Sequence, residues 1–231
     1  MFFDPVYLLF LAPGMLLSFW ASARVKSTFA HYSQVASRSG MSGAEAAREL
    51  LRRQNILDVE IEPVEGFLSD HYDPGSKTLR LSPDVYHGRS LSSLGVAAHE
   101  AGHAIQHAHA YGPLAFRSMV VRPAMLGSNL GMVVLGLGLM THVTGMVWVG
   151  IALFSAFVVF TLVTLPVEFN ASSRAVAALV DTSIISQSEA ADTKRVLDAA
   201  ALTYVAAAIS AVLQLVYLLF RAGLFNSRDN D

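Results

Sequence analysis

Four uncharged apolar stretches constrain the fold of this chain more than any other feature. They cover residues 6–23, 124–140, 146–167 and 199–220. A helix needs roughly 20 apolar residues to cross the hydrocarbon core of a bilayer, and each stretch is close to that length. With 53% hydrophobic and 15% charged residues, the chain is also too apolar for an ordinary soluble protein. The sequence therefore predicts a mainly α, multi-pass membrane protein with about four transmembrane helices.

The first apolar stretch has one feature of a secretory signal. Its end, Ala21-Ser22-Ala23, resembles a small-residue cleavage site. A signal peptide also has a basic segment before the apolar run, whereas this chain has Asp4 there. We therefore expect an uncleaved transmembrane anchor.

Basic residues near the membrane ends predict the orientation of the chain. Most Lys and Arg residues lie between Arg24 and Arg122, a few lie between 174 and 195, and the connection 141–145 has none. By the positive-inside rule, both larger non-membrane regions face the cytoplasm across a cell membrane. The expected organisation is a transmembrane anchor at 1–23, a cytoplasmic region at 24–122, a transmembrane hairpin at 123–167, a cytoplasmic helical region at 168–198, and a last transmembrane helix with its tail at 199–231.

Composition limits the chemistry and the partners. The chain has no cysteine, so disulfides and thiolate ligands are excluded and a metal must be held by His and carboxylate groups. The formal net charge of −2 gives no indication of a nucleic-acid partner. The lipid bilayer is the partner that the composition does predict.

The stretch His99-Glu100-Ala101-Gly102-His103 is the strongest chemical motif. Residues four apart lie on the same face of a helix, so His99 and His103 can offer two imidazole nitrogens to a single metal ion. Glu100 then lies beside the metal, where a base takes a proton from a metal-activated water. The motif predicts a zinc site.

A histidine-rich surface helix is the alternative explanation of this motif, because His107 and His109 follow closely. The residues around the motif are nevertheless almost all apolar, which indicates a buried helix. Buried polar groups need partners, and a metal ion supplies them. Ser90 or Ser92 can cap this helix, and Gly112-Pro113 is the expected end of it.

Three short segments between the first helix and the motif are typical of β-strands. They cover 59–61, 67–72 and 77–81, with a turn at Asp73-Pro74-Gly75-Ser76. They predict a small antiparallel sheet, and thus an α+β, zincin-like region around the motif helix. The segment 77–82 is the candidate edge strand for pairing with an extended substrate, and a purely structural hairpin is the alternative.

Glu168 is the candidate third ligand. Hydrolytic zinc sites usually have three protein ligands and keep one position open for water. Glu168 follows Pro166 at the end of an apolar span, and a carboxylate at a membrane boundary is costly unless it is paired. The alternative is an interfacial acid that lies in water or pairs with Arg174.

His109 competes with Glu168, because it lies ten residues after His99, as in the pattern H-E-x-x-H-x-x-G-x-x-H. That pattern uses its glycine to turn the chain and bring the last histidine to the metal. This chain has Gln106 at the glycine position, which disfavours the turn.

The sequence resembles the YugP-like family of bacterial neutral zinc metallopeptidases, which are multi-pass membrane proteins similar in outline to the HtpX-type proteases. The stretches that carry the resemblance are 24–40, Asp70-His71-Tyr72-Asp73-Pro74, His99-Glu100-Ala101-Gly102-His103-Ala104-Ile105-Gln106, Leu165-Pro166-Val167-Glu168-Phe169 and Ala200-Ala201-Leu202-Thr203-Tyr204-Val205-Ala206.

The resemblance implies a zinc peptidase in which His99 and His103 are metal ligands and Glu100 is the catalytic acid and base. It implies Glu168 as third ligand more weakly, by analogy with other membrane zinc proteases. The family often has an acid at the position of Asn170 and an arginine at that of Ser173. These departures concern the groups that support the ligands, and not the ligands themselves.

The predicted reaction is hydrolysis of peptide bonds in a polypeptide substrate, which can itself be membrane-associated. A further donor should stabilise the oxyanion of such a reaction. By residue type the candidates are His71, Tyr72, Tyr111 and Tyr204.

Two other functions compete with this prediction. An intramembrane protease would have its zinc inside the bilayer, which the polarity of the motif helix and the basic flanks disfavour. A zinc-binding or catalytically silent membrane scaffold would use the same ligands without cleavage. No charged residue interrupts the apolar spans, so nothing indicates a transporter.

Overall fold

The computed structural model describes residues 5–223 of the chain. Asp4 and most of the predicted C-terminal tail lie outside the described residues. The chain forms two compact units, and the boundaries between them fall within or beside the long helices. The membrane unit contains the described residues of 1–20, 115–166 and 203–231, and the site unit contains Ala21–Leu114 and Val167–Leu202.

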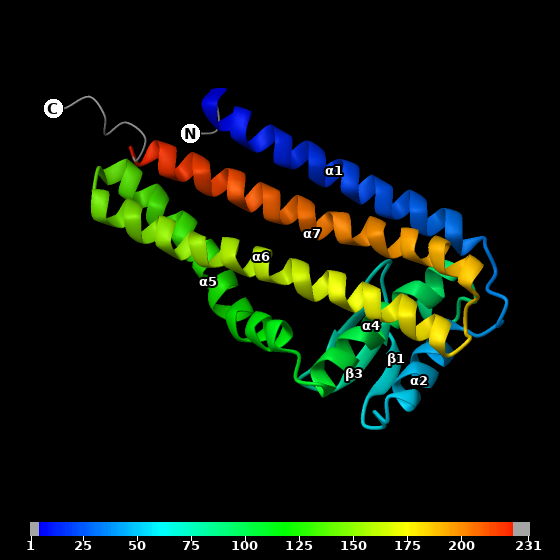
Figure 1. The fold of residues 1–231 in the computed structure, drawn as a ribbon. Helices are drawn as coiled ribbons and strands as arrows, with labels where there is room; N and C mark the ends of the chain where they lie inside the picture. The colour runs from blue at the N-terminus through cyan, green and yellow to red at the C-terminus, as the bar shows by residue number, and fades with distance from the viewer. Residues whose placement is uncertain (1–4, 224–231) are drawn as a thin grey trace. The chain divides into compact units, whose positions relative to one another are not determined.

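Four helices are long and apolar enough to cross a membrane (Figure 1). They are α1 (Pro5–Ser33), α5 (Gly112–Thr141), α6 (Thr144–Asp181) and α7 (Gln187–Arg221). Together with the small sheet described below, they confirm the prediction of a mainly α, multi-pass membrane protein with a small α+β region. In the membrane unit, buried apolar residues from α5, α6 and α7 form one core.

The helix α5 begins earlier than its apolar stretch. It starts at Gly112, where proline at the next position suits the first turn of a helix, and it continues through Pro123. The last two long helices are separated by a short connection, since α6 ends at Asp181 and α7 begins at Gln187.

In the site unit, two capped helices pack against each other to form much of the core. The helix α2 (Gly43–Arg53) begins at a capping box, in which Ser42 and Glu45 bond to each other's backbone N–H groups. The helix α4 (Leu91–Ala108) carries the motif, and the Ser90 side chain caps it by accepting from Ser93 N. A short helix, α3 (Pro83–Tyr86), precedes it.

The end of α4 differs from the prediction. The helix stops at Ala108, before Gly112-Pro113, because Ala110 adopts a left-handed conformation with φ of 49°. The N–H of Tyr111 then donates to the carbonyl of Gln106, which satisfies a carbonyl of the last turn.

The three strands form a mixed sheet with the order β1-β3-β2. The strand β3 (Thr78–Leu81) pairs in parallel with β1 (Glu60–Pro63) and antiparallel with β2 (His71–Asp73). The prediction of a purely antiparallel sheet was therefore wrong.

The prediction of an edge strand at 77–82 was also wrong, because β3 is the central strand. Leu79 and Leu81 are completely buried, whereas β1 and β2 are partly exposed. The most apolar strand thus takes the position with a neighbour on each side. Both β2 and β3 contact α4, which brings the sheet beside the motif helix (Figure 1).

Candidate metal centre

Helix α4 presents His99 and His103 side by side. Their ring centroids are 4.8 Å apart. The neighbouring Ala97, Ala98 and Ala101 are buried in the core of the site unit, so the apolar residues of the helix fix its rotation. The spacing of four residues then places both imidazoles on one face, as the sequence predicts.

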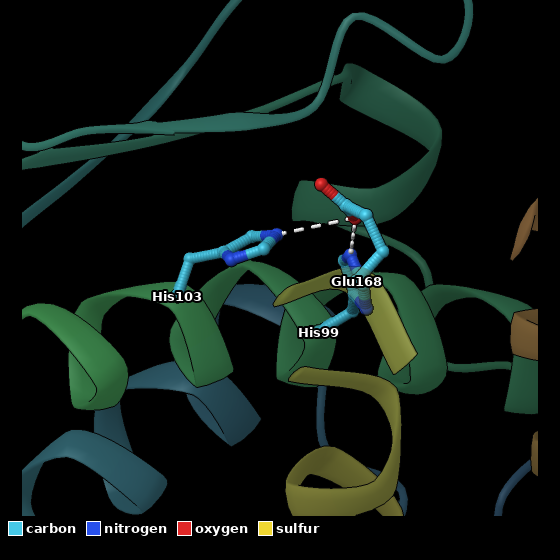
Figure 2. Close-up of side chains that lie close together, drawn as sticks. All are labelled: His99, His103 and Glu168. Atoms are coloured by element: carbon cyan, nitrogen blue, oxygen red, sulfur yellow. Dashed lines mark hydrogen bonds and ion pairs between the residues drawn. The ribbon is translucent and has the colours of Figure 1, made fainter. Parts of the chain in front are cut away.

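Glu168 comes from α6 and points between the two rings (Figure 2). Its Oε2 atom is 3.2 Å from Nε2 of His99 and 3.4 Å from Nε2 of His103. One donor atom from each of the three residues lies within 4.8 Å of the others. The Glu168 side chain is buried, with 1% of the residue exposed. Tertiary structure therefore brings together two imidazole nitrogens and one carboxylate oxygen.

A glycine in the motif allows the two helices to come this close. A Cβ atom at Gly102 would lie 3.0 Å from the carbonyl oxygen of Ala171 on α6. A side chain at this position would push α6 away from α4 and separate Glu168 from the histidines.

The other ring nitrogens of the two histidines are held by hydrogen bonds. Nδ1 of His99 lies 3.1 Å from the Ser172 hydroxyl, and Nδ1 of His103 lies 3.0 Å from Oε1 of Gln106. When Nδ1–H donates in these contacts, Nε2 keeps its lone pair for a metal ion. Two imidazoles and one carboxylate form a typical set of zinc ligands, and the residues present therefore fit this metal.

The electrostatics of the cluster favour a positive charge. Burial disfavours the charged form of His103, but the hydrogen bond with Glu168 and the negative charges of Glu100 and Glu168 together raise the pKa of His103. A bound cation benefits from the same negative charges.

Glu100 is buried beside the cluster without being part of it. Among residues 5–223, no side chain forms a hydrogen bond or ion pair with its carboxylate in the structure. Asp70 lies close enough to Glu100 to interact with it electrostatically. Burial raises the pKa of Asp70, and the negative charge of Glu100 raises it further. The hydrogen bonds that Asp70 accepts from the Ser82 N–H and hydroxyl oppose this rise in pKa. Sequence reasoning assigned no role to Asp70, although it directly precedes His71.

His109 is not part of the cluster. It is the exposed C-cap residue of α4, and its backbone N–H donates to Ile105. The backbone thus stays helical up to His109, and it does not make the tight turn that would bring this side chain to the cluster.

The four candidate oxyanion donors lie in different places, and their proposed role stays a prediction. His71 is exposed, with Nδ1 2.8 Å from the carbonyl of Ser69. The hydroxyl of Tyr72 is 2.9 Å from Nδ1 of His107. The guanidinium of Arg174 lies over the Tyr111 ring at 5.8 Å. Tyr204 belongs to the membrane unit.

Comparison with known proteins gives two matches. The model of a family described as "Putative neutral zinc metallopeptidase" matches residues 7–223. The protein described as "Putative membrane protease YugP" from Bacillus subtilis (strain 168) is 46% identical over 215 residues, which are 93% of this chain and 95% of that protein. No solved structure matches the chain.

Both matches extend over nearly the whole chain and include the motif helix and the Glu168 segment. They confirm the resemblance that the sequence indicated, with zinc as the metal of the family. The chain therefore belongs to the YugP-like family of neutral zinc metallopeptidases.

Proposed function

We propose that this protein is a zinc-dependent membrane endopeptidase in which His99, His103 and Glu168 hold the metal. The observation that carries the proposal is the position of one carboxylate oxygen 3.2 and 3.4 Å from the two Nε2 atoms, with Glu100 next to His99 but outside the ligand set. A glutamate as third ligand makes the site gluzincin-like.

The proposed reaction needs one base that also serves as an acid. Zinc, when bound, supplies a Lewis acid that polarises the scissile carbonyl and makes water more acidic. Glu100 accepts a proton from the attacking water as the new C–O bond forms. It then donates this proton to the amine nitrogen as the C–N bond breaks, so that the carboxylate is regenerated.

The sheet offers a binding edge for an extended polypeptide. Because β3 is central, β2 is an edge strand of the sheet, and it also contacts the motif helix. A substrate strand added at this edge would use backbone hydrogen bonds, which suit many peptide sequences. Tyr72 lies on this strand and remains a candidate oxyanion donor together with His71, Tyr111 and Tyr204.

The proposal is tested by digesting a peptide library with the purified full-length chain in detergent. We expect cleavage at internal bonds, loss of cleavage after zinc is removed with a chelator, and recovery when zinc is restored. Mass spectrometry of the fragments identifies the bonds cut. If the zinc-loaded protein cleaves no peptide in the library and no unfolded protein substrate, the proposed endopeptidase activity is wrong.

We further propose that the protein lies in the cell membrane with its metal site on the cytoplasmic side. Reporter fusions after Ala110 and after Asp192 should both report the cytoplasm, because the basic residues that flank the spans lie in these regions. A fusion after His142, between α5 and α6, is the matched control and should report the opposite side. Disagreement between the first two fusions would contradict the topology, since the metal site needs both regions on one side.

A further inference from the structure

Gln106 is a buried amide whose bonds connect the two ligand-bearing helices. It lies on α4, three residues after His103, and is 0% exposed. Its Oε1 atom is 3.0 Å from Nδ1 of His103. Its Nε2 atom donates to the carbonyl of Val167 and to Oδ1 of Asn170, both at 3.0 Å.

These partners determine which way the amide points. A backbone carbonyl can only accept, so the amide NH₂ group of Gln106 must face Val167. The amide oxygen must then face His103. Because that oxygen also can only accept, Nδ1 of His103 must carry a hydrogen. The lone pair of Nε2 is thereby directed toward the metal site.

The same amide also fixes the segment that carries the third ligand. Val167 and Asn170 lie on either side of Glu168 in the α6 helix. Oδ1 of Asn170 accepts a second bond, 2.7 Å long, from Nε of Arg174, which holds it in place. One side chain of α4 therefore bonds to a histidine ligand and to both flanks of the Glu168 position.

We propose that Gln106 is a positioning residue that sets the tautomer of His103 and holds α4 and α6 in the register at which His103 and Glu168 meet. The proposal rests on the proposed function for the identity of the ligands. It also gives a reason for Gln106 at the position where the pattern H-E-x-x-H-x-x-G-x-x-H has glycine. In this chain α4 continues through that position to Ala108, and the helical turn after His103 supports the site.

The expected effect of losing this support is weaker metal binding. Removing a partner that orients a metal ligand typically costs about 10- to 100-fold in metal affinity. Gln106→Met keeps the length and volume of the side chain but removes all three hydrogen bonds. We expect its zinc affinity, measured in detergent by competition with a chromophoric chelator, to fall by about 10- to 100-fold.

A spectroscopic measurement separates positioning from a general loss of stability. In the cobalt(II)-substituted protein, the ring N–H protons of the ligand histidines give strongly shifted NMR signals that disappear in D₂O if they exchange with solvent. Gln106→Met should broaden or shift the His103 signal and should leave the His99 signal unchanged. Ser172→Ala is the matched variant and should affect the His99 signal alone, because Ser172 bonds to His99.

Three further variants complete the test. Gln54→Met changes a glutamine outside the site, and its zinc affinity and both signals should equal those of the wild type. Asn170→Ala removes one of the two acceptors on α6 and should weaken zinc binding even if Gln106→Met does not fold. Asn170→Asp keeps an acceptor for both Gln106 and Arg174 and should retain the His103 signal.

The proposal is overturned if Gln106→Met or Asn170→Ala binds zinc as tightly as the wild type with both N–H signals unchanged. The metal measurements do not depend on peptidase activity. If the wild type binds zinc and cleaves no substrate, the proposed function fails while the role of Gln106 is still tested. If the wild type cleaves substrate and Gln106→Met keeps its zinc affinity and its signals, only the positioning role fails.

Discussion

Glu100→Gln is expected to abolish measurable peptide cleavage while zinc remains bound. The amide has the size and shape of the carboxylate but cannot take a proton from water, and loss of a general base typically costs about 10²- to 10⁴-fold in rate. Zinc binding should persist, because the clustered donor atoms come from His99, His103 and Glu168. The measurements are kcat/KM on a peptide identified by the library digest, and bound zinc per chain.

Glu65→Gln is the control for this experiment, since Glu65 is exposed in the loop between β1 and β2. It should change neither cleavage nor bound zinc. Full cleavage by Glu100→Gln would show that another group is the base. Full biological function in a Glu100→Gln strain whose protein no longer cleaves peptides would instead favour the catalytically silent scaffold, and loss of zinc with retained cleavage would contradict both assigned roles.

Glu168→Ala is expected to lose bound zinc and peptidase activity together. The substitution removes one of the three proposed ligand atoms and leaves the buried His103 and the partly buried His99 without the carboxylate that faces them. The loss of zinc affinity should exceed the roughly 10- to 100-fold that follows loss of a supporting partner. Metal analysis of the purified variant after dialysis, together with its kcat/KM, measures both effects.

His109→Ala is the matched variant, because His109 was the competing third ligand. Its side chain is at the exposed C-cap of α4 and outside the cluster, so this variant should keep most of its zinc and activity. If His109→Ala loses zinc and Glu168→Ala keeps it, the assignment of Glu168 is wrong.

Local features of the sequence were sufficient for several parts of this structure. The four long helices follow from apolar stretches that match the thickness of a bilayer. The start of α2 at Gly43 follows from its capping residues, because Ser42 and Glu45 form a capping box. The pairing of His99 with His103 follows from the helical repeat alone. Each of these depends on residues within a few positions of one another.

Other features needed the tertiary structure. The strand β3 is central and buries Leu79 and Leu81 completely, and the spacing of strands along the chain carries no information about their order in the sheet. The early end of α4 depends on a left-handed Ala110, a conformation that few residues other than glycine adopt.

The candidate site also has features that the sequence predicted and features that only the folded chain shows. The sequence was sufficient to predict a membrane protein with a zinc motif, and it indicated Glu168 because a carboxylate at the end of an apolar span needs a partner. The tertiary structure was needed to place Glu168 within 3.4 Å of both histidines, to bring Asp70 close enough to Glu100 for an electrostatic interaction, and to bond Gln106 to residues on both sides of Glu168. The physical reason is that caps, turns and helical faces are determined by residues that are neighbours in the chain. The contacts of the site instead join side chains that are far apart in the sequence. They also depend on how closely Gly102 allows α4 and α6 to approach each other.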